Sequence, residues 1–480
     1  MTRLSNAALR SEVSKLKELV VDLTEKHDQL LIENTFLKER LAVYEHRLNK
    51  TSRNSSKPPS SDGLGKPKAA VKPAKGSRPS GGQAGHKGHT LRRSNKVDHI
   101  LDHRPTSCAH CGSSLTADQK AIITKVRQVQ DLPARQPLVI TDHRVLTCQC
   151  EQCGETTTGS FPTEVKAPVQ YGPNLQQQVV YLGVEQLLPI RRIGQVINTF
   201  CGARLSEGTI CNYIKSFAQR FQPVHTHLGD LVKQAPITHC DETGMRVKGS
   251  LHWFHVGTTE AFCYFWLGQS RGDVMTGAQG IVVHDHWPPY QSKMPHVQHA
   301  YCLAHLAREC TGLAEMGEQW TGKMADLFND IMKVTKPGRS LSAKVVAMME
   351  ARFDRLLQEG ITYHNQLDPL PQKGRGRPKR RKGHNLVHRL YNYREGTLMC
   401  LHNPLVPATN NLAERDIRVL KLKMKISGSF RQKEGARDFA ILRSVLETAR
   451  KQGWNALATL GTKADVLIEQ LAPEKPVPNT

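Results

Sequence analysis

The chain has 480 residues, and 67 lysines and arginines against 43 acidic residues give it a net charge of +24. This length suits roughly three domains, and the excess charge predicts a polyanionic partner, most often nucleic acid. No apolar run approaches the ~18–20 residues of a membrane-spanning helix, and the start of the chain lacks an apolar signal core, so we expect a cytoplasmic protein. Twelve cysteines in such a chain favour metal binding or free thiols over disulfides.

A seven-residue apolar repeat runs through residues 1–50. Its two seams consist of Leu9, Leu16, Leu23, Leu30, Leu37 and Tyr44, and of Val13, Val20, His27, Asn34, Leu41 and Leu48. This pattern predicts a leucine-zipper-like coiled coil of about six heptads, in which the polar Asn34 fixes the register. We therefore expect a homo-oligomer, a dimer or larger. The alternative is one amphipathic helix packed on its own domain.

Residues 51–100 change character and become rich in Ser, Pro, Gly and Lys. They contain eleven lysines or arginines, and their only acids are Asp62 and Asp98. Such a segment buries too little apolar surface to offset its chain entropy, so we expect a flexible basic arm that contacts phosphates without sequence preference.

Two Cys-x-x-Cys knuckles mark residues 101–168 as a zinc-binding domain. Cys108 and Cys111 precede Gly112, and Cys150 and Cys153 precede Gly154. Four thiolates complete a tetrahedral, closed structural Zn²⁺ site that leaves no position for a catalytic water. Cys148 is a spare that could replace Cys150. The apolar stretches 121–129 and 138–146 predict strands between the knuckles.

Residues 169–230 have the pattern of a helix-turn-helix DNA-binding domain. Leu188-Pro189 breaks the first of three predicted helices between 174 and 221, Gly202 ends the second, and Ser206 caps the third. The third helix would bury Ile210, Ile214 and Phe217 and present Glu207, Thr209, Asn212 and Lys215 to DNA, of which Thr209, Asn212 and Lys215 are the candidate DNA contacts. Three-helix packing without DNA is the alternative.

From residue 231 to 455 the pattern predicts an α/β catalytic domain. Three strands, 237–247, 251–257 and 261–267, are followed by a helix-compatible segment up to Gly280, a fourth strand 281–283 and a fifth, 297–302. This order is that of a ribonuclease-H-like fold. In it, Asp241 on the first strand and Asp285 after the fourth lie side by side, and Glu414 arrives on a later helix.

Three converging carboxylates have a chemical purpose. Each would resist ionisation beside the others, and two divalent ions about 3.5–4 Å apart would remove that repulsion and stabilise both oxygens of a phosphoryl displacement. Oxygen ligands select Mg²⁺ or Mn²⁺, so we assign Asp241, Asp285 and Glu414 as catalytic magnesium ligands. Individually, Asp241 could be a turn residue, Asp285 a strand-end acid, and Glu414 a first-turn acid that favours the helix dipole.

The helix that carries Glu414 begins near Thr409 or Asn410, whose short polar side chains predict a cap. Leu412, Ala413, Ile417 and Leu420 recur at helical spacing and indicate a buried stripe. Basic residues that follow Glu414 are candidates for contacts with the DNA backbone: Arg415, Arg418, Lys421, Lys423, Lys425 and Arg431.

Nearly 130 residues separate Asp285 from Glu414, and about 306–405 read as an α-helical insertion. Cys302 and His305 have Cys-x-x-His spacing, near His296 and His299, and either support the active site or bind a second metal. In the same insertion Arg375-Gly376-Arg377 resembles the core of a minor-groove AT-hook, with a solvated basic loop as the alternative. The chain ends in a helix and tail, 456–480.

The resemblance of this chain to a known family rests on motifs from almost its whole length: Arg53 to Ser60, Gly81-Gly82-Gln83 with Gly85-His86, the paired knuckles, Cys240-Asp241-Glu242-Thr243, His284-Asp285-His286-Trp287 with Tyr290, Cys302 with Ala304-His305-Leu306 and Arg308-Glu309, Thr409 to Arg418, Lys425 to Arg431, and Arg450 to Gly453. With them the chain resembles the transposases of bacterial insertion sequences of the IS66 family, in the Asp-Asp-Glu class. The resemblance implies that Asp241, Asp285 and Glu414 are the catalytic triad and that the preceding modules recognise transposon ends.

The sequence as a whole thus predicts a multidomain α/β DNA transposase of the bacterial cytoplasm, associated with the nucleoid. It would bind the terminal inverted repeats of its element in double-stranded DNA, free 3′-hydroxyl ends, and join them to target DNA by two-metal-ion transesterification. Small accessory proteins of the same element are further possible partners by resemblance. The alternatives are a non-enzymatic DNA-binding regulator and a ribonuclease-H-like nuclease without strand transfer.

Overall fold

The computed structural model describes residues 6–48, 50–51, 54–55, 91, 93–131, 138–153, 155–370 and 379–471. The chain divides into two compact units, one of Met1–Leu64, Thr141–Thr199 and Ala203–Thr480, the other of Gly65–Ile140 and Phe200–Gly202. In the ranges described, no helix combines the length and apolar character needed to cross a membrane.

The N-terminal heptads form one continuous helix, α1 (Asn6–Leu48). Four seam leucines, Leu16, Leu23, Leu30 and Leu37, are 53–65% exposed in the single chain. The predicted helix is confirmed, and its seam is not covered by the chain itself. Self-association through this seam stays a prediction.

Most of the predicted basic arm lies outside the described residues. Asn54 is an exception, because its Nδ2 donates a hydrogen bond of 2.6 Å to Glu315 Oε2. The Arg53-to-Ser60 motif therefore contains a side chain with a specific contact on the folded part of its own unit.

The strands predicted between the knuckles are wrong. Residues 121–129 and 138–146 have no regular structure, and Ile122, Ile123 and Val129 are at least 78% exposed. Strand propensity reflects packing on a half-buried pleated surface, and here no partner strand supplies one. The strands that do form are the short antiparallel pair β1 (Thr147–Gln149) and β2 (Thr156–Thr158), around the second knuckle.

The three-helix segment is confirmed, with one correction to its length. Ser206 caps the last helix, since its Oγ accepts a 3.0 Å hydrogen bond from the Thr209 backbone N–H. That helix continues beyond the predicted end at 221, because buried Phe221, Val224 and Leu228 extend its apolar stripe. The elements are α2 (Pro173–Val180), η2 (Tyr181–Glu185), α3 (Ile190–Cys201) and α4 (Glu207–Gln234).

A five-stranded mixed sheet follows, in the spatial order β5-β4-β3-β6-β7. The first three strands form an antiparallel meander, β6 is parallel to β3, and β7 is parallel to β6. The predicted strands are confirmed within one or two residues. They are β3 (Ile237–Val247), β4 (Ser250–Thr258), β5 (Cys263–Gly268), β6 (Ile281–His284) and β7 (Gln298–Tyr301).

The helix-compatible segment before Gly280 is not a helix. Residues 269–280 form successive turns. Asp273 accepts hydrogen bonds from the backbone N–H groups of Gln269 and Ser270 and from the Ser270 hydroxyl, at 2.7–3.0 Å. An aspartate that satisfies nearby backbone donors in this way stabilises a turn at the expense of a helix.

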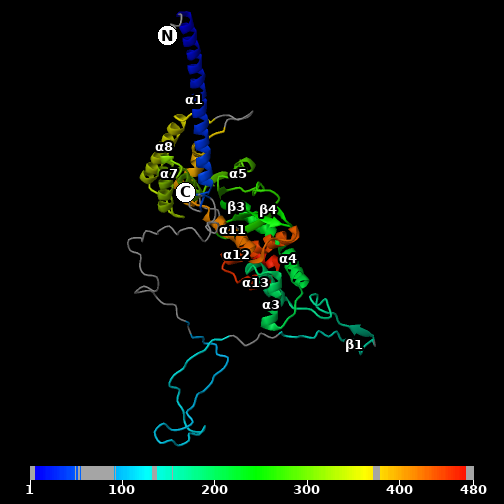
Figure 1. Cartoon of the computed structure of the whole chain (residues 1–480). Coiled ribbons are helices and arrows are strands. Elements are labelled where there is room, and N and C mark those ends of the chain that lie inside the picture. Colours follow the sequence, from blue (N-terminus) through cyan, green and yellow to red (C-terminus); the bar gives the residue numbers. More distant parts are fainter. Residues whose placement is uncertain are drawn as a thin grey trace. The chain divides into compact units, whose positions relative to one another are not determined.

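Helices from the end of the chain cover the meander. Figure 1 shows α11 (Asn411–Ser427) and α12 (Lys433–Lys451) together with α4 beside β3 and β4. Their shared core includes Phe221, Phe254 and Phe439. The short helices α13 (Ala456–Gly461) and α14 (Ala464–Gln470) close this side against α2 and α4.

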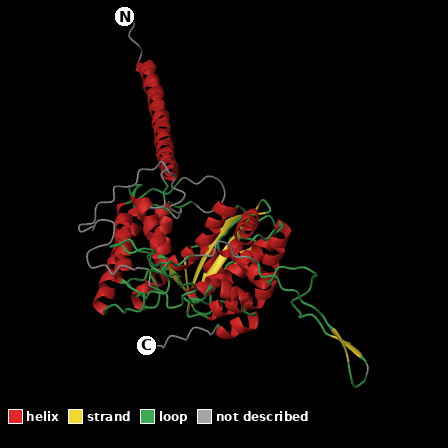
Figure 2. Cartoon of the chain, turned by 90° about the horizontal axis from the view of Figure 1, so that it is seen from below, coloured by secondary structure: helices red, strands yellow, loops and turns green. Residues whose placement is uncertain are grey.

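The residues between β7 and α11 form a helical insertion, as predicted. Leu306, Phe328, Phe353 and Leu386 belong to a second core that packs against β6 and β7. In Figure 2 the strands of the five-stranded sheet consequently lie between two groups of helices. After the short α5 (Pro288–Lys293), these helices are α6 (Leu303–Ala314), α7 (Gln319–Val334), α8 (Ala343–Asn365), α9 (Lys382–Asn392) and α10 (Arg394–His402).

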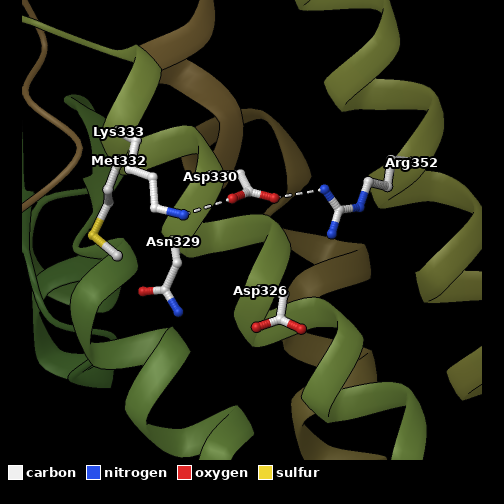
Figure 3. A pocket seen from close by; sticks show the side chains of 6 residues that line it. All are labelled: Asp326, Asn329, Asp330, Met332, Lys333 and Arg352. Atoms are coloured by element: carbon white, nitrogen blue, oxygen red, sulfur yellow. Dashed lines mark hydrogen bonds and ion pairs between the residues drawn. The ribbon is translucent and has the colours of Figure 1, made fainter. Parts of the chain in front are cut away.

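A surface hollow on this insertion lies between α7 and α8. Figure 3 shows the Asp330 carboxylate between Lys333 and Arg352, at 2.9 and 2.8 Å. Asp326, Asn329 and Met332 complete the lining. Because its central carboxylate is paired on both sides, the hollow offers no free anionic ligand at its centre.

Candidate active site

The sheet itself brings two of the three predicted acids together. β3 and β6 run parallel with His239 opposite Val283. Two residues further along stand Asp241 and Asp285, so the same register places them side by side. Burial raises the pKa of Asp241 well above its ordinary value, and the charges of Glu242, Asp285 and Glu414 raise it further. The charges of Asp285 and Glu414 therefore act on Asp241.

Asn410 fixes the position of the helix that carries the third acid, Glu414. Its Nδ2 donates a 2.8 Å hydrogen bond to the Cys240 carbonyl oxygen, and its Oδ1 lies 2.9 Å from His239 Nδ1. Its backbone N–H donates to Cys302 Sγ at 3.1 Å. The start of α11 is thereby fastened to β3, beside Asp241, and to the start of α6.

This bonding corrects the predicted helix cap. Asn410 is the N-cap residue of α11, but its side chain makes no capping hydrogen bond. It is buried, and a buried amide must satisfy its donors and acceptor locally. β3 offers that satisfaction, so Asn410 positions the helix and does not cap it.

Glu414 lies in the first turn of α11 and is partly buried. Its Oε1 is 3.5 Å from His305 Nδ1 and 3.9 Å from Arg308 Nη2, while Oε2 is 4.0 Å from Arg418 Nη2. Burial raises the pKa of Glu414, and Asp285 adds to this while Arg308 and Arg418 oppose it. Oε1 is buried without a hydrogen-bond partner among the described residues, so this oxygen is available to a ligand.

Arg271, beside the acids, was missed by the sequence analysis, which quoted Glu242 and Tyr290 as motif residues and gave them no role. Arg271 Nε donates to Glu242 Oε1 at 2.8 Å, and Arg271 Nη2 lies 3.8 Å from Asp285 Oδ2. Tyr290 also donates to Glu242, at 2.8 Å. Glu242 follows Asp241 directly, and this position signals a role beside the acids. Arg271 lies in the segment misread as helical, where no sequence signal pointed to the acids.

The predicted phosphate contacts on α11 fall on different sides of the helix. Glu414, Arg418, Lys421 and Lys425 follow one another every three or four residues and share a face. Burial lowers the pKa of Lys421, and the charge of Asp241 opposes that shift, which places Lys421 near the acids. Lys423, in contrast, lies over the Phe430 ring at 4.5 Å.

The other predicted DNA contacts are spread more widely. Arg415 is exposed, 3.8 Å from Asp416. Arg431 is close enough to Cys211 on α4 for its charge to lower the pKa of that thiol, against the larger effect of burial. Asn212 and Lys215 are exposed on α4, as expected, while Thr209 is partly buried. Arg375 and Arg377 lie outside the described residues.

Each Cys-x-x-Cys knuckle has the backbone of a tight turn. In the first, Gly112 has φ +75°, its N–H donates to the Cys108 carbonyl oxygen at 2.9 Å, and the Cys111 thiol lies 3.0 Å from the Ser113 hydroxyl. That hydroxyl is the main reason that the pKa of Cys111 is lowered to about 7. A lowered pKa favours the thiolate form that binds zinc.

In the second knuckle the Cys150 N–H donates to the Glu155 carbonyl oxygen at 2.7 Å. Hydrogen bonds from the Cys153 and Gln152 backbone lower the pKa of Cys150. Cys148, the alternative ligand, lies in β1 opposite Thr157. The two knuckles belong to different compact units, and zinc binding by their four cysteines stays a prediction.

The donor set of the acid cluster fits hard divalent cations. All three acids offer oxygen, and burial raises the pKa of each of them. The charges of neighbouring acids raise the pKa of Asp241 and Glu414 further. Of the cations nearby, Arg271 approaches Asp285 no closer than 3.8 Å. Bound Mg²⁺ or Mn²⁺ would remove this repulsion. The fold and site define an α/β protein in which Asp241 and Asp285 lie side by side at the sheet, with the charge of Glu414 acting on Asp241.

Comparison with known protein families identifies the family to which the chain belongs. The model described as "Transposase IS66 family" matches residues 168–438, more than half of the chain and all three acids. The chain belongs to the IS66 family of transposases, which confirms the resemblance. Residues 3–92 match a family of unknown function (DUF6444), and no curated protein matches the chain.

Proposed function

We propose that this transposase cuts DNA at the ends of its element and joins the freed 3′-hydroxyl ends to target DNA by direct transesterification. The observation that supports the proposal is the position of Asp241 beside Asp285 on parallel strands, with Glu414 on a helix near enough for its charge to raise the pKa of Asp241. No nucleophile of the protein is required, because water and then the DNA hydroxyl attack phosphorus. Positioning and charge neutralisation carry such a reaction.

The core is, in this proposal, ribonuclease-H-like. A three-stranded antiparallel meander followed by two strands parallel to the first supports it. The parallel register of β3 and β6 brings the residue after the end of β6, Asp285, beside Asp241 in the middle of β3. The helical insertion between β7 and α11 is compatible with this core, because α11 still returns to β3.

We assign Asp241, Asp285 and Glu414 as the residues that hold Mg²⁺ or Mn²⁺. Two such ions, when bound, stabilise the attacking and leaving oxygens of an in-line displacement. Arg271 holds Glu242 in place and lies beside Asp285, which limits the movement of that carboxylate. Arg418 and Lys421, on the same face of α11 as Glu414, would hold backbone phosphates next to the acids.

The other modules would recognise DNA and assemble the complex. Exposed Asn212 and Lys215 on α4 support its role as a recognition helix, and the basic arm and the Arg375-Gly376-Arg377 segment would add further contacts. A structural Zn²⁺ would join Cys108, Cys111, Cys150 and Cys153. Cutting two ends in concert needs two or more copies, which the exposed seam of α1 supports. Small accessory proteins of the element, and association with the nucleoid, complete the proposal.

A mobility assay in cells tests this function. A marked element with its native flanking DNA is scored for insertions into a recipient plasmid, with wild-type protein and with Asp285→Asn, and with the other genes of the element supplied. Insertions with wild type only support the proposal. Insertions with both proteins would contradict the assignment of Asp285, and DNA cut without joining would indicate a nuclease instead.

A further inference from the structure

A second set of possible metal ligands shares Glu414 with the acid cluster. Cys302, His305 and Glu414 each offer one ligand atom, and these atoms lie within 4.8 Å of one another. The three residues come from two elements, the start of α6 and the first turn of α11. Unlike the acid cluster, this set combines sulfur, nitrogen and oxygen.

The backbone holds these three side chains together. Cys302 and His305 are three residues apart at the start of α6, so they share a face of that helix. The Leu303 N–H donates to the Ala408 carbonyl oxygen at 2.9 Å, and the Asn410 N–H donates to Cys302 Sγ at 3.1 Å. These two bonds tie the chain before α11 to the beginning of α6, so the ligand atoms do not depend on a mobile loop.

The ligand atoms also have unused capacity. His305 Nδ1 and Glu414 Oε1 are both buried without a hydrogen-bond partner among the described residues, and they lie 3.5 Å apart. Ligand atoms about 2.0–2.3 Å from a tetrahedral ion are separated by roughly 3.3–3.8 Å, from the tetrahedral angle. The observed separation therefore suits two ligands of one ion.

We propose that Cys302, His305 and Glu414 bind a borderline divalent metal ion of the Zn²⁺ class, and that this ion inhibits the transposase by withdrawing Glu414 from Asp241 and Asp285. A thiolate and an imidazole select Zn²⁺ over Mg²⁺, and three protein ligands leave the fourth position to water. Arg308, 3.9 Å from the same carboxylate oxygen, disfavours a cation there and keeps the binding reversible. The inhibitory part rests on the function proposed above; the binding part does not.

Zinc stoichiometry of the full-length protein tests the site directly. Wild type, Cys302→Ser, His305→Gln and Cys310→Ser are equilibrated at the same free Zn²⁺, and bound metal is counted. Cys310 is the matched control, a buried cysteine on the same helix outside the ligand set. The knuckle cysteines are unchanged in all four proteins, so their zinc cancels in the comparison.

We expect wild type and Cys310→Ser to hold one more equivalent of zinc than Cys302→Ser and His305→Gln. Serine keeps an acceptor for the Asn410 N–H, and His305→Gln leaves that bond untouched, so at least one ligand variant retains the fold. Equal stoichiometry in all four proteins would overturn the site.

Inhibition is measured on Mg²⁺-supported cleavage of an element end, with each protein normalised to its own zinc-free rate. Half-inhibition of Cys302→Ser should need at least about tenfold more free Zn²⁺ than that of wild type or Cys310→Ser. Equal sensitivity would mean that zinc acts elsewhere and would overturn the inhibitory role. If wild type cleaves nothing even with the accessory proteins of the element present, the proposed function fails, while the stoichiometry still decides the site.

Discussion

Glu414 and Asp416 stand two residues apart on α11 and are used in opposite ways. Asp416 is fully buried, and its Oδ2 accepts hydrogen bonds from Thr258 and is paired with Lys451, both at 2.8 Å. The nearest bases of Glu414 stay at 3.5–4.0 Å, and its Oε1 has no hydrogen-bond partner among the described residues. Asp416 Oδ1 also lacks a hydrogen-bond partner among the described residues, and its nearest bases are Arg450 at 3.6 Å and Arg415 at 3.8 Å. Asp416 therefore has one closely paired oxygen, whereas neither oxygen of Glu414 has a base closer than 3.5 Å.

Asp416 belongs to a larger buried network of charged residues. Arg450 lies 3.6 Å from Asp416 and is also paired with Glu447. Glu447 pairs with Arg443, which in turn reaches Glu185 of η2 at 2.5 Å. This network links the three-helix segment to the helix that carries Glu414. The two acids differ in how closely their own chain pairs them: Asp416 has a base at 2.8 Å and belongs to the structure, whereas Glu414 has no base closer than 3.5 Å and keeps capacity for a ligand.

Asp241→Asn should give the largest effect on the chemical side. Loss of one anionic ligand removes several kcal/mol of charge stabilisation, so end cleavage should fall at least about a thousandfold. Stability should not fall, because burial and like charges already disfavour the ionised carboxylate. Cleavage of a labelled end and thermal unfolding are measured on the same preparation. A stable variant with undiminished cleavage would contradict the assignment.

Lys451→Met should give the largest effect on the structural side. It leaves Asp416 as a buried charge without its closest partner, which costs about 3 kcal/mol of unfolding free energy. Urea unfolding measures the loss, with exposed Lys463→Met as the matched control. If both variants unfold at the same urea concentration, the network does not stabilise the protein as described.

Lys421 and Lys423 lie on different sides of α11. Substitution of each in turn separates the side that faces the acids from the side that packs against Phe430. Lys421→Gln should weaken DNA binding several-fold and reduce the dependence of log K on log salt by about one, as loss of one phosphate contact does. Lys423→Gln should leave both unchanged, because Lys423 lies over Phe430 and donates to the Ser427 hydroxyl. The test is the affinity of each variant for end DNA, measured at several salt concentrations. Equal effects would mean that both lysines contact DNA.

Lys423 also predicts a pH-dependent stability difference. Burial lowers its pKa from 10.5 to about 8. Between these values the unfolded chain keeps a proton that the folded chain has released, so wild-type stability rises with pH there. Lys423→Met should therefore be more stable than wild type by on the order of 1 kcal/mol at pH 7, and this advantage should shrink from pH 8 to pH 10. A difference that is constant with pH would refute the buried-lysine explanation.

The sequence predicted the sheet and its acids because local signals and packing agree there. β3, β4 and β5 are separated by clear turns, and Asp285 follows a short apolar strand. The sequence analysis failed where contacts between distant residues decide the local structure. Ile122 and Val129 have strand propensity but no surface to pack on. Asp273 turns the chain where periodicity allows a helix, and Asn410 bonds to β3 in place of capping its own helix.

The most direct test of the comparison replaces each of the two carboxylates by the corresponding amide. Glu414→Gln and Asp416→Asn are purified as full-length proteins, and Mg²⁺-dependent end cleavage and thermal unfolding are measured on both. Glu414→Gln should lose cleavage at an unfolding temperature at or above that of wild type, because it removes a buried charge without breaking a hydrogen bond. Asp416→Asn should unfold several degrees lower and still cleave at temperatures where it is folded. The reverse result, an active Glu414→Gln and a stable but inactive Asp416→Asn, would contradict the account.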